Sequence, residues 1–340
     1  MKFIGMDAHS RNSFFVVLGK SGRVLMRREV KTQEAELLGF VRSIKGPKKL
    51  AFEEGVMSQW LYLLLKDEVE ELVVCQPREK KGPKTDEIDA GELADLLRVG
   101  RLKSVFHSDS LLMNLRVITS GYDDATQELT RIKNRYKAVY RQVAISTETT
   151  GFYESEDMLS LLDTEERYYV ACTLFEQIRL FEEQRMGYME RFESNVSRYK
   201  PIKLLTSIPG IGPVRANQIV AVMVTPYRFP KKYNLFSYAM LTKHNQISDG
   251  KLYGKQRALG QSVLKKVFKS AALSAIKSNT AFRRKYDAMR AAGKDDRAAR
   301  NAVAKMIAAT VMGVWKSGKK YNDKHREVTQ RRSQRSHSGA

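Results

Sequence analysis

Short apolar runs separated by turn-forming residues dominate the first hundred residues. Runs rich in Val, Ile, Phe and Leu cover residues 3–9, 13–19, 23–30, 49–53 and 71–76. They are too short for ordinary helices and fit β-strands. Apolar residues at helical spacing cover residues 33–44, 58–65 and 86–99. Three strands in series, followed by helix, strand, helix, strand and helix, predict an α/β domain with a mixed sheet.

The middle of the chain carries a longer pattern. From Leu111 to Val143 apolar residues recur at spacings of four and three, and a looser version runs from Ala171 to Tyr199. A seam sustained this long favours a coiled coil over a surface helix. The acidic, turn-prone link over residues 147–164 then predicts an antiparallel helical hairpin. We expect it to serve oligomerisation, because a lone long hairpin buries little core.

Beyond Pro201 the pattern is mainly helical. Helical spacing covers residues 204–225, 261–277, 281–292 and 295–316. The residues after Gly318 are basic and polar, which is typical of a frayed end. The pattern therefore predicts an α/β domain, a coiled-coil hairpin, a mainly α domain and a basic tail, over residues 1–107, 108–200, 201–318 and 319–340.

The net charge is unevenly distributed along the chain, which suggests that its parts have different roles. The 340 residues include 60 Lys and Arg against 38 Asp and Glu, a formal net charge of +22. Residues 201–340 alone carry +23, while residues 1–108 carry +3 and residues 109–200 carry −4. This excess points to a polyanionic partner, most simply nucleic acid, held by the last part of the chain.

Two further features bear on the cell compartment. The 2 cysteines, Cys75 and Cys172, are far apart, which excludes a disulfide scaffold and a Cys-rich zinc module and fits a reducing cytoplasm. No apolar run approaches the length of a membrane span, and the first residues carry no signal-peptide pattern.

Five carboxylates stand at predicted element ends. Asp7 ends the first predicted strand, Glu53 and Glu54 end the fourth, and Asp86 and Asp89 open a helix one turn apart. Each has an ordinary structural explanation, as a turn former, a helix N-terminal charge or a surface residue. Together they match a site that binds two Mg²⁺ ions for phosphodiester chemistry. The 5 histidines show no metal-ligand spacing.

The basic part contains two candidate phosphate-binding segments. I-P-G-I-G-P-V-R-A, with Gly210 and Gly212, is similar to a helix-hairpin-helix, whose tight turn directs backbone N–H groups at a phosphate. Ser248 follows in a polar I-S-D-G segment. From chemistry alone Ser248 is a turn residue. A role as nucleophile for phosphoryl transfer needs cations close by, and the segment offers Lys251, Lys255 and Arg257.

The order of these motifs resembles a known family. G-M-D, F-E-E-G, T-D-E-I-D-A, a long helical middle, I-P-G-I-G, a serine–glycine loop and a basic helical end follow one another. This is similar to the DEDD insertion-sequence transposases, the IS110 family, over residues 1–320. T-D-E-I-D-A with its upstream Asp and Glu is the specific part of the resemblance, and the Gly-rich turn alone is not.

The resemblance implies a mechanism and partners. It implies a RuvC-like, ribonuclease-H-like first domain whose metal-binding set, in chain order, is Asp7, Glu53, Asp86 and Asp89. It implies Mg²⁺ as the cofactor, in two ions, and Ser248 as a nucleophile that forms a phosphoserine with DNA. Its expected partners are donor DNA, target DNA, an element-encoded guide (bridge) RNA and further copies of the chain in a dimer or tetramer. The expected location is the cytoplasm of a bacterium or archaeon.

Two departures leave alternatives open. The family's usual Glu-Ala-Thr-Gly is Glu-Glu-Gly here, so Glu54 is an alternative ligand to Glu53. The usual Gly-Leu-x-Pro ahead of the serine is replaced by A-M-L-T-K-H, so Ser237 is an alternative nucleophile. Two other functions also stay open: a metal-dependent junction-resolving nuclease without a covalent intermediate, and a non-catalytic nucleic-acid-binding protein.

Overall fold

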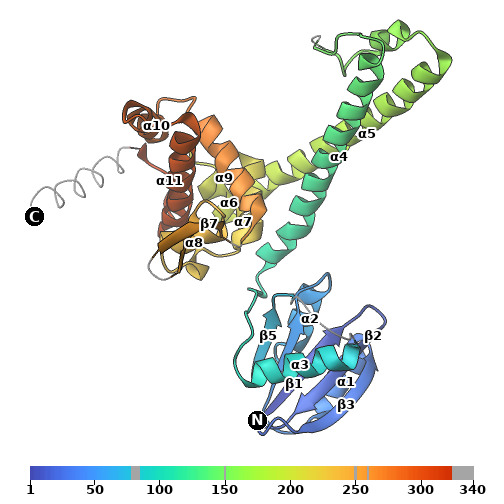
Figure 1. The fold of residues 1–340 in the computed structure, drawn as a ribbon, viewed down its shortest axis with the longest axis vertical. Helices are drawn as coiled ribbons and strands as arrows, with labels where there is room; N and C mark the ends of the chain where they lie inside the picture. The colour runs from blue at the N-terminus through green and yellow to red at the C-terminus, as the bar shows by residue number, and fades with distance from the viewer. Residues whose placement is uncertain (78–84, 149–150, 249–250, 259, 324–340) are drawn as a thin grey trace, which may run out of the picture. The chain divides into compact units, whose positions relative to one another are not determined.

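The computed structural model describes residues 1–77, 85–148, 151–248, 251–258 and 260–323 (Figure 1). Contacts between Cα atoms divide the chain into two units, Met1–Ser110 and Leu111–Ala340. The second unit contains both the predicted hairpin and the predicted C-terminal domain. Within the described residues, no helix is long and apolar enough to cross a membrane.

The first unit is built on a five-stranded mixed sheet. Its strands are β1 (Lys2–Ala8), β2 (Asn12–Leu18), β3 (Val24–Lys31), β4 (Lys48–Glu53) and β5 (Glu71–Cys75), in the order β3-β2-β1-β4-β5. The first three strands are antiparallel neighbours, and β4 and β5 run parallel to β1. The predicted mixed α/β sheet is confirmed, and it is consistent with a ribonuclease-H-like domain.

Helices cover the two faces of this sheet. Helices α1 (Glu34–Ser43) and α2 (Ser58–Leu65) pack with Met6 and Phe52 on one face. Helix α3 (Asp86–Arg98) packs on the other face, visible in front of β1 in Figure 1. Side chains alternate along a strand, so the neighbours of Met6 and Phe52 point to the α3 face. Gly5, Asp7 and Glu53 therefore share that face.

Gly5 lets α3 lie unusually close to β1. A Cβ atom at Gly5 would stand 1.9 Å from the carbonyl oxygen of Ala90 and 2.5 Å from the backbone nitrogen of Ala94. Both distances are far inside van der Waals contact. No other residue type fits here without moving the helix, because only glycine lacks a Cβ.

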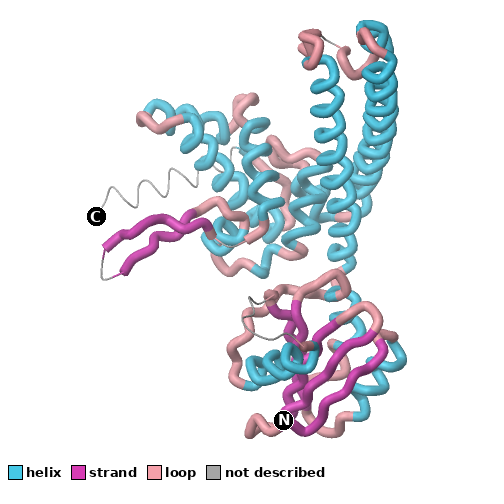
Figure 2. Tube along the Cα trace, turned by 45° about the vertical axis from the view of Figure 1, so that its right-hand side comes forward, coloured by secondary structure: helices cyan, strands magenta, loops and turns pink. Residues whose placement is uncertain are grey.

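The second unit begins with two long helices that pack on each other. They are α4 (Leu115–Arg141), preceded by the 3₁₀ turn η1 (Leu111–Asn114), and α5 (Glu165–Arg198). Figure 2 shows them side by side as a helical hairpin. The buried residues of α4 include six from the predicted seam: Leu115, Ala125, Leu129, Ile132, Tyr136 and Val139. Helix α4 lies within the range that the spacing predicts, whereas α5 begins at Glu165, before the predicted start at Ala171.

The far end of the hairpin has a core of its own. Phe152 and Leu159, from the link that includes η2 (Glu156–Leu161), pack with Tyr136, Tyr140 and Phe175. The rings of Phe152 and Tyr140 have their centroids 5.0 Å apart in an edge arrangement, a favourable geometry for aromatic pairs. The expectation that a lone hairpin buries little core is therefore wrong.

The rest of the second unit is mainly helical. Its helices are α6 (Lys200–Leu205), α7 (Pro213–Met223), η3 (Pro226–Arg228), α8 (Lys232–Tyr238), α9 (Ser262–Ala275), α10 (Ala281–Ala291) and α11 (Asp296–Ser317). Ile219, Phe268 and Ile307 lie in the large core that these helices share. The last three helices match the three predicted ones. The predicted basic tail lies mostly outside the described residues.

A two-stranded hairpin interrupts these helices. Strands β6 (Lys243–Ser248) and β7 (Lys251–Arg257) pair antiparallel and extend away from the helices in Figure 2. The sequence pattern did not predict it, because K-H-N-Q-I-S is largely polar. The Asp249-Gly250 dipeptide, which favours tight hairpin turns, was the available signal.

Polar contacts join the two long helices, α4 and α5, to α7. Asn195 of α5 donates to Asn217 Oδ1 at 2.8 Å, and both residues are buried. Gln218 donates to Asp123 Oδ1 of α4 at 2.7 Å. Burial raises the pKa of the Asp123 carboxyl above its ordinary value of 3.8, although the hydrogen bond from Gln218 opposes this.

Replacing Gly5 by Ala should lower the free energy of unfolding by about 1–3 kcal/mol, because the new methyl group must displace α3. The matched control is Gly91→Ala, on α3 itself, where a Cβ meets nothing within 4 Å. That change should stabilise the helix by about 0.5–1 kcal/mol. Denaturant unfolding followed by circular dichroism measures both. Equal stability of Gly5→Ala and the parent chain would contradict the close approach.

Asp123→Asn should make the protein more stable near neutral pH. The folded carboxyl has the raised pKa, so its contribution to stability is present below about pH 3.8 and is lost as the pH rises through the folded value. An amide carries no charge and keeps an oxygen for Gln218. Thermal unfolding from pH 3 to 8 should show the gain shrinking toward acid, and a difference independent of pH would refute the assignment.

Candidate functional site

Two of the candidate carboxylates lie at the carboxyl ends of neighbouring parallel strands. The β1–β4 register pairs Met6 with Phe52, so Asp7 and Glu53 are the next residues along each strand. Both point to the α3 face, as argued above from the alternation of side chains. Asp7 is mostly covered, with 16% of its side chain exposed. The sheet therefore sets these two carboxylates side by side at one edge.

The start of α3 brings two more carboxylates to this edge. Thr85 caps the helix, because its side-chain oxygen accepts the backbone N–H of Ile88 at 3.2 Å. Asp86 and Asp89 occupy the first turn, and Asp89 is buried. Asp89 directly precedes Ala90, which packs on Gly5. The first turn of α3 is thereby held over the end of β1.

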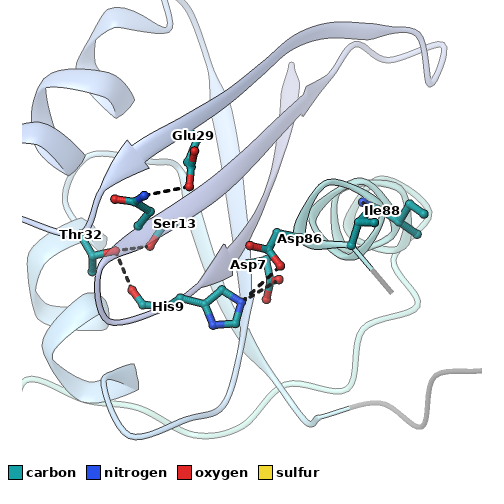
Figure 3. Close-up of polar contacts among 9 residues, drawn as sticks. Asp7, His9, Ser13, Glu29, Thr32, Asp86 and Ile88 are labelled. Atoms are coloured by element: carbon teal, nitrogen blue, oxygen red, sulfur yellow. Dashed lines mark hydrogen bonds and ion pairs between the residues drawn. The ribbon is translucent and has the colours of Figure 1, made fainter. Parts of the chain in front are cut away.

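A histidine joins Asp7 and Asp86 in this structure (Figure 3). His9 Nε2 lies 3.3 Å from Asp7 Oδ2 and 3.6 Å from Asp86 Oδ1. One ligand atom from each of the three residues lies within 4.8 Å of the other two. His9 and Glu53 also line one pocket, of about 320 Å³. The structure thus brings Asp7 and Asp86 together, with Glu53 near them.

This set of donors fits a divalent cation. Carboxylate oxygens are the ligands that Mg²⁺ prefers, and several of them close together favour a positive ion that offsets their mutual repulsion. The covered Asp7 and the exposed Asp86 leave the cluster open on one side, since 59% of the Asp86 side chain is accessible. A phosphate group can therefore approach a cation held here.

Glu54 has a different neighbour. Its Oε2 lies 2.6 Å from Nε2 of His107, a side chain only 2% exposed. The other ring nitrogen of His107 lies 2.9 Å from Gln59 Oε1. Gln59 in turn donates to the carbonyl oxygen of Ser108 at 2.8 Å. Since Glu54 is engaged with His107 and Glu53 faces α3, the geometry favours Glu53 as the ligand.

Of the two candidate glycines, Gly210 has a packing role. Its φ is +85°, and a Cβ there would lie 2.4 Å from the carbonyl oxygen of Ala271 in α9. Arg215 fixes the turn by donating to the Gly210 carbonyl at 2.7 Å and to Ser270 Oγ at 2.8 Å. Burial lowers the pKa of this guanidinium. Gly212, at the start of α7, has open space at its Cβ position.

Ser248 is the last residue of β6, paired with Lys251 at the start of β7. The side chains of Ser248, Lys255 and Arg257 lie outside the described parts of the structure, whereas Lys251 is exposed. Ser237, the alternative nucleophile, is half-buried inside α8. The two serines thus lie on different elements, Ser248 at the end of a strand and Ser237 within a helix.

His9 and Arg215 were missed in the sequence. The histidines were set aside because their spacing shows no metal-ligand pattern, but the structure places His9, two residues after Asp7 in D-A-H, beside Asp7 and Asp86. Arg215 stands two residues after Pro213 in the Gly-rich motif, but its partners Ser270 and Ser274 come from a distant helix. Only the spacing around His9 offered a signal.

Comparison with known families covers both units. Residues 4–145 match a DEDD model of the IS110 type, described as a transposase, and residues 202–287 match a model described as the transposase IS116/IS110/IS902 family. A comparison with curated proteins gives no match. The first match contains the carboxylate site and the second contains the Gly-rich turn and Ser248. The chain therefore belongs to the IS110 family of transposases.

Proposed function

We propose that this transposase is an RNA-guided DNA recombinase that cuts and rejoins DNA strands with a carboxylate metal site and a serine nucleophile. The observation that carries the proposal is the convergence of Asp7 and Asp86 beside His9 at one edge of the sheet. A protein that only binds nucleic acid gains nothing from grouped acids next to a polyanion. Such a group becomes useful once cations hold the phosphate against it.

In this proposal Asp7, Glu53, Asp86 and Asp89 hold Mg²⁺, in two ions. When bound, Mg²⁺ supplies positive charge that stabilises the attacking and leaving oxygens of a phosphodiester. Asp7 and Glu53 contribute rigidity, because each belongs to a strand of the sheet. Asp86 and Asp89 contribute from a capped helix whose position depends on Gly5.

Ser248 is the proposed nucleophile. Its oxygen attacks a DNA phosphorus and loses its proton, the phosphorus–oxygen bond of the strand breaks, and a deoxyribose hydroxyl leaves with a proton. A phosphoserine ester replaces the phosphodiester, so the number of phosphoester bonds is unchanged. Attack by a hydroxyl of another DNA end reverses the exchange and restores Ser248. Joining therefore needs no external energy source.

The basic excess supports a large polyanionic partner. Residues 201–340 carry a net charge of +23, more than one short DNA contact requires. We infer that donor DNA, target DNA and a guide RNA are the ligands, and that Gly210, Gly212, Lys251, Lys255 and Arg257 contribute phosphate contacts. Gly212 is the better-placed glycine, because its Cβ position is open. Copies of the chain assemble as a dimer or tetramer.

Ser248→Ala should abolish a covalent protein–DNA adduct while binding of nucleic acid is retained. Labelled element-end DNA, Mg²⁺ and denaturing gels detect the adduct, and the loss should exceed about a thousandfold because the nucleophile itself is absent. The matched control is Ser237→Ala, which should keep the adduct.

An adduct that persists in Ser248→Ala refutes the serine role. Mg²⁺-dependent cleavage without any adduct in the parent protein indicates a junction-resolving nuclease. Binding without cleavage indicates a non-catalytic protein.

The purified full-length protein should carry a discrete RNA, identified by sequencing, and Lys251→Ala should weaken binding of that RNA. The loss of one phosphate contact should reduce the slope of log affinity against log salt by about one. Lys20→Ala, at an exposed turn of the first unit, is the matched control and should leave the slope unchanged. Heterogeneous cellular RNA, or an unchanged slope in Lys251→Ala, would count against this assignment.

A further inference from the structure

We propose that the imidazole of His9 is a ligand of the same metal ion as Asp7 and Asp86. This site then binds ions that accept nitrogen ligands, Mn²⁺ foremost, more tightly than an all-carboxylate site of the same family would. The inference rests on the proposed function, because it takes the carboxylates to be metal ligands. It adds a residue that lies outside the D, E, D, D set.

The three side chains are spaced for one ion. Ligands about 2.1 Å from an octahedral ion are separated from one another by about 3.0 to 4.2 Å. His9 Nε2 lies 3.3 Å from Asp7 Oδ2 and 3.6 Å from Asp86 Oδ1. The same nitrogen thus faces both carboxylates at the separations that shared coordination requires, and Figure 3 shows the ring turned toward them.

The backbone of His9 is held in place although its ring is half-exposed. Thr32 Oγ1 donates to the carbonyl oxygen of His9 at 2.6 Å and lies 2.8 Å from Ser13 Oγ. Ser13 is fully buried, and the backbone N–H of Thr32 donates to the carbonyl of Arg11 at 2.8 Å. The turn between β1 and β2 is therefore fixed from the end of β3. These contacts fix the backbone from which the His9 ring extends toward Asp7 and Asp86.

An imidazole changes which ions the site prefers. Mg²⁺ takes oxygen ligands and keeps several waters, so a nitrogen ligand adds little to its binding. Mn²⁺ and later transition ions accept imidazole readily, and their affinities for nitrogen-containing sites rise along the series. We therefore predict that the site formed by Asp7, His9 and Asp86 prefers Mn²⁺ over Mg²⁺, and that the His9 imidazole causes this preference.

The test uses the full-length protein with Mn²⁺ alone as the probe. Electron spin-echo spectroscopy of bound Mn²⁺ should show modulation from a coordinated ¹⁴N nucleus, and His9→Gln should remove it. Calorimetry should show Mn²⁺ affinity falling roughly tenfold or more in His9→Gln, with less change for Mg²⁺. Asn12→Ala is the matched control, since Asn12 lies in the next strand and donates to Glu29, away from the cluster.

The outcomes separate the two proposals. Mn²⁺ that binds without ¹⁴N modulation, or with modulation that persists in His9→Gln, overturns the role of His9. If Asp7→Asn still abolishes that binding, the carboxylate metal site survives. Equal, negligible Mn²⁺ binding by the parent chain and Asp7→Asn overturns the metal site itself, and the role of His9 with it.

Discussion

The contact between Gly5 and α3 is the constraint on which the candidate site depends. A missing Cβ lets the backbone of Ala90 and Ala94 rest against the backbone of β1. The distance between helix and sheet is therefore set by main-chain atoms, which are more rigid than side chains. Asp86 comes within reach of Asp7 because its helix begins just before this contact. The arrangement of the candidate site therefore depends on Gly5, a residue without a functional side chain.

The spacing of apolar residues predicted the elements best where buried and exposed side chains alternate along a strand. The first unit follows its apolar runs closely, because each strand buries one side against α1 and α2. The positions of Asp7, Glu53 and Asp86 follow from that pattern together with the parallel pairing of β1 and β4. The apolar pattern did not decide between Glu53 and Glu54 as the ligand. That decision requires two structural facts: the face of the sheet on which Phe52 is buried, and the contact of Glu54 with His107.

Contacts between distant segments explain what the pattern missed. The spacing in α4 is the same for a hairpin that needs a partner and for one closed by its own link, and Phe152 of that link belongs to no periodic run. Strands β6 and β7 stabilise each other by backbone pairing and carry few apolar residues, so neither strand stands out. The ring of His9 joins a cluster of possible metal ligands only because α3 places Asp86 beside it.

The Glu54–His107 contact has a mechanical consequence. His107 belongs to the last stretch of the first unit, which also pairs with β5 through Val105 and with α2 through Ser108. A force applied to the chain where it leaves this unit acts on these contacts one after another. The load reaches the carboxyl end of β4 through Glu54, the residue next to Glu53. The candidate carboxylate site is therefore linked, through Glu54 and His107, to the stretch with which the first unit ends.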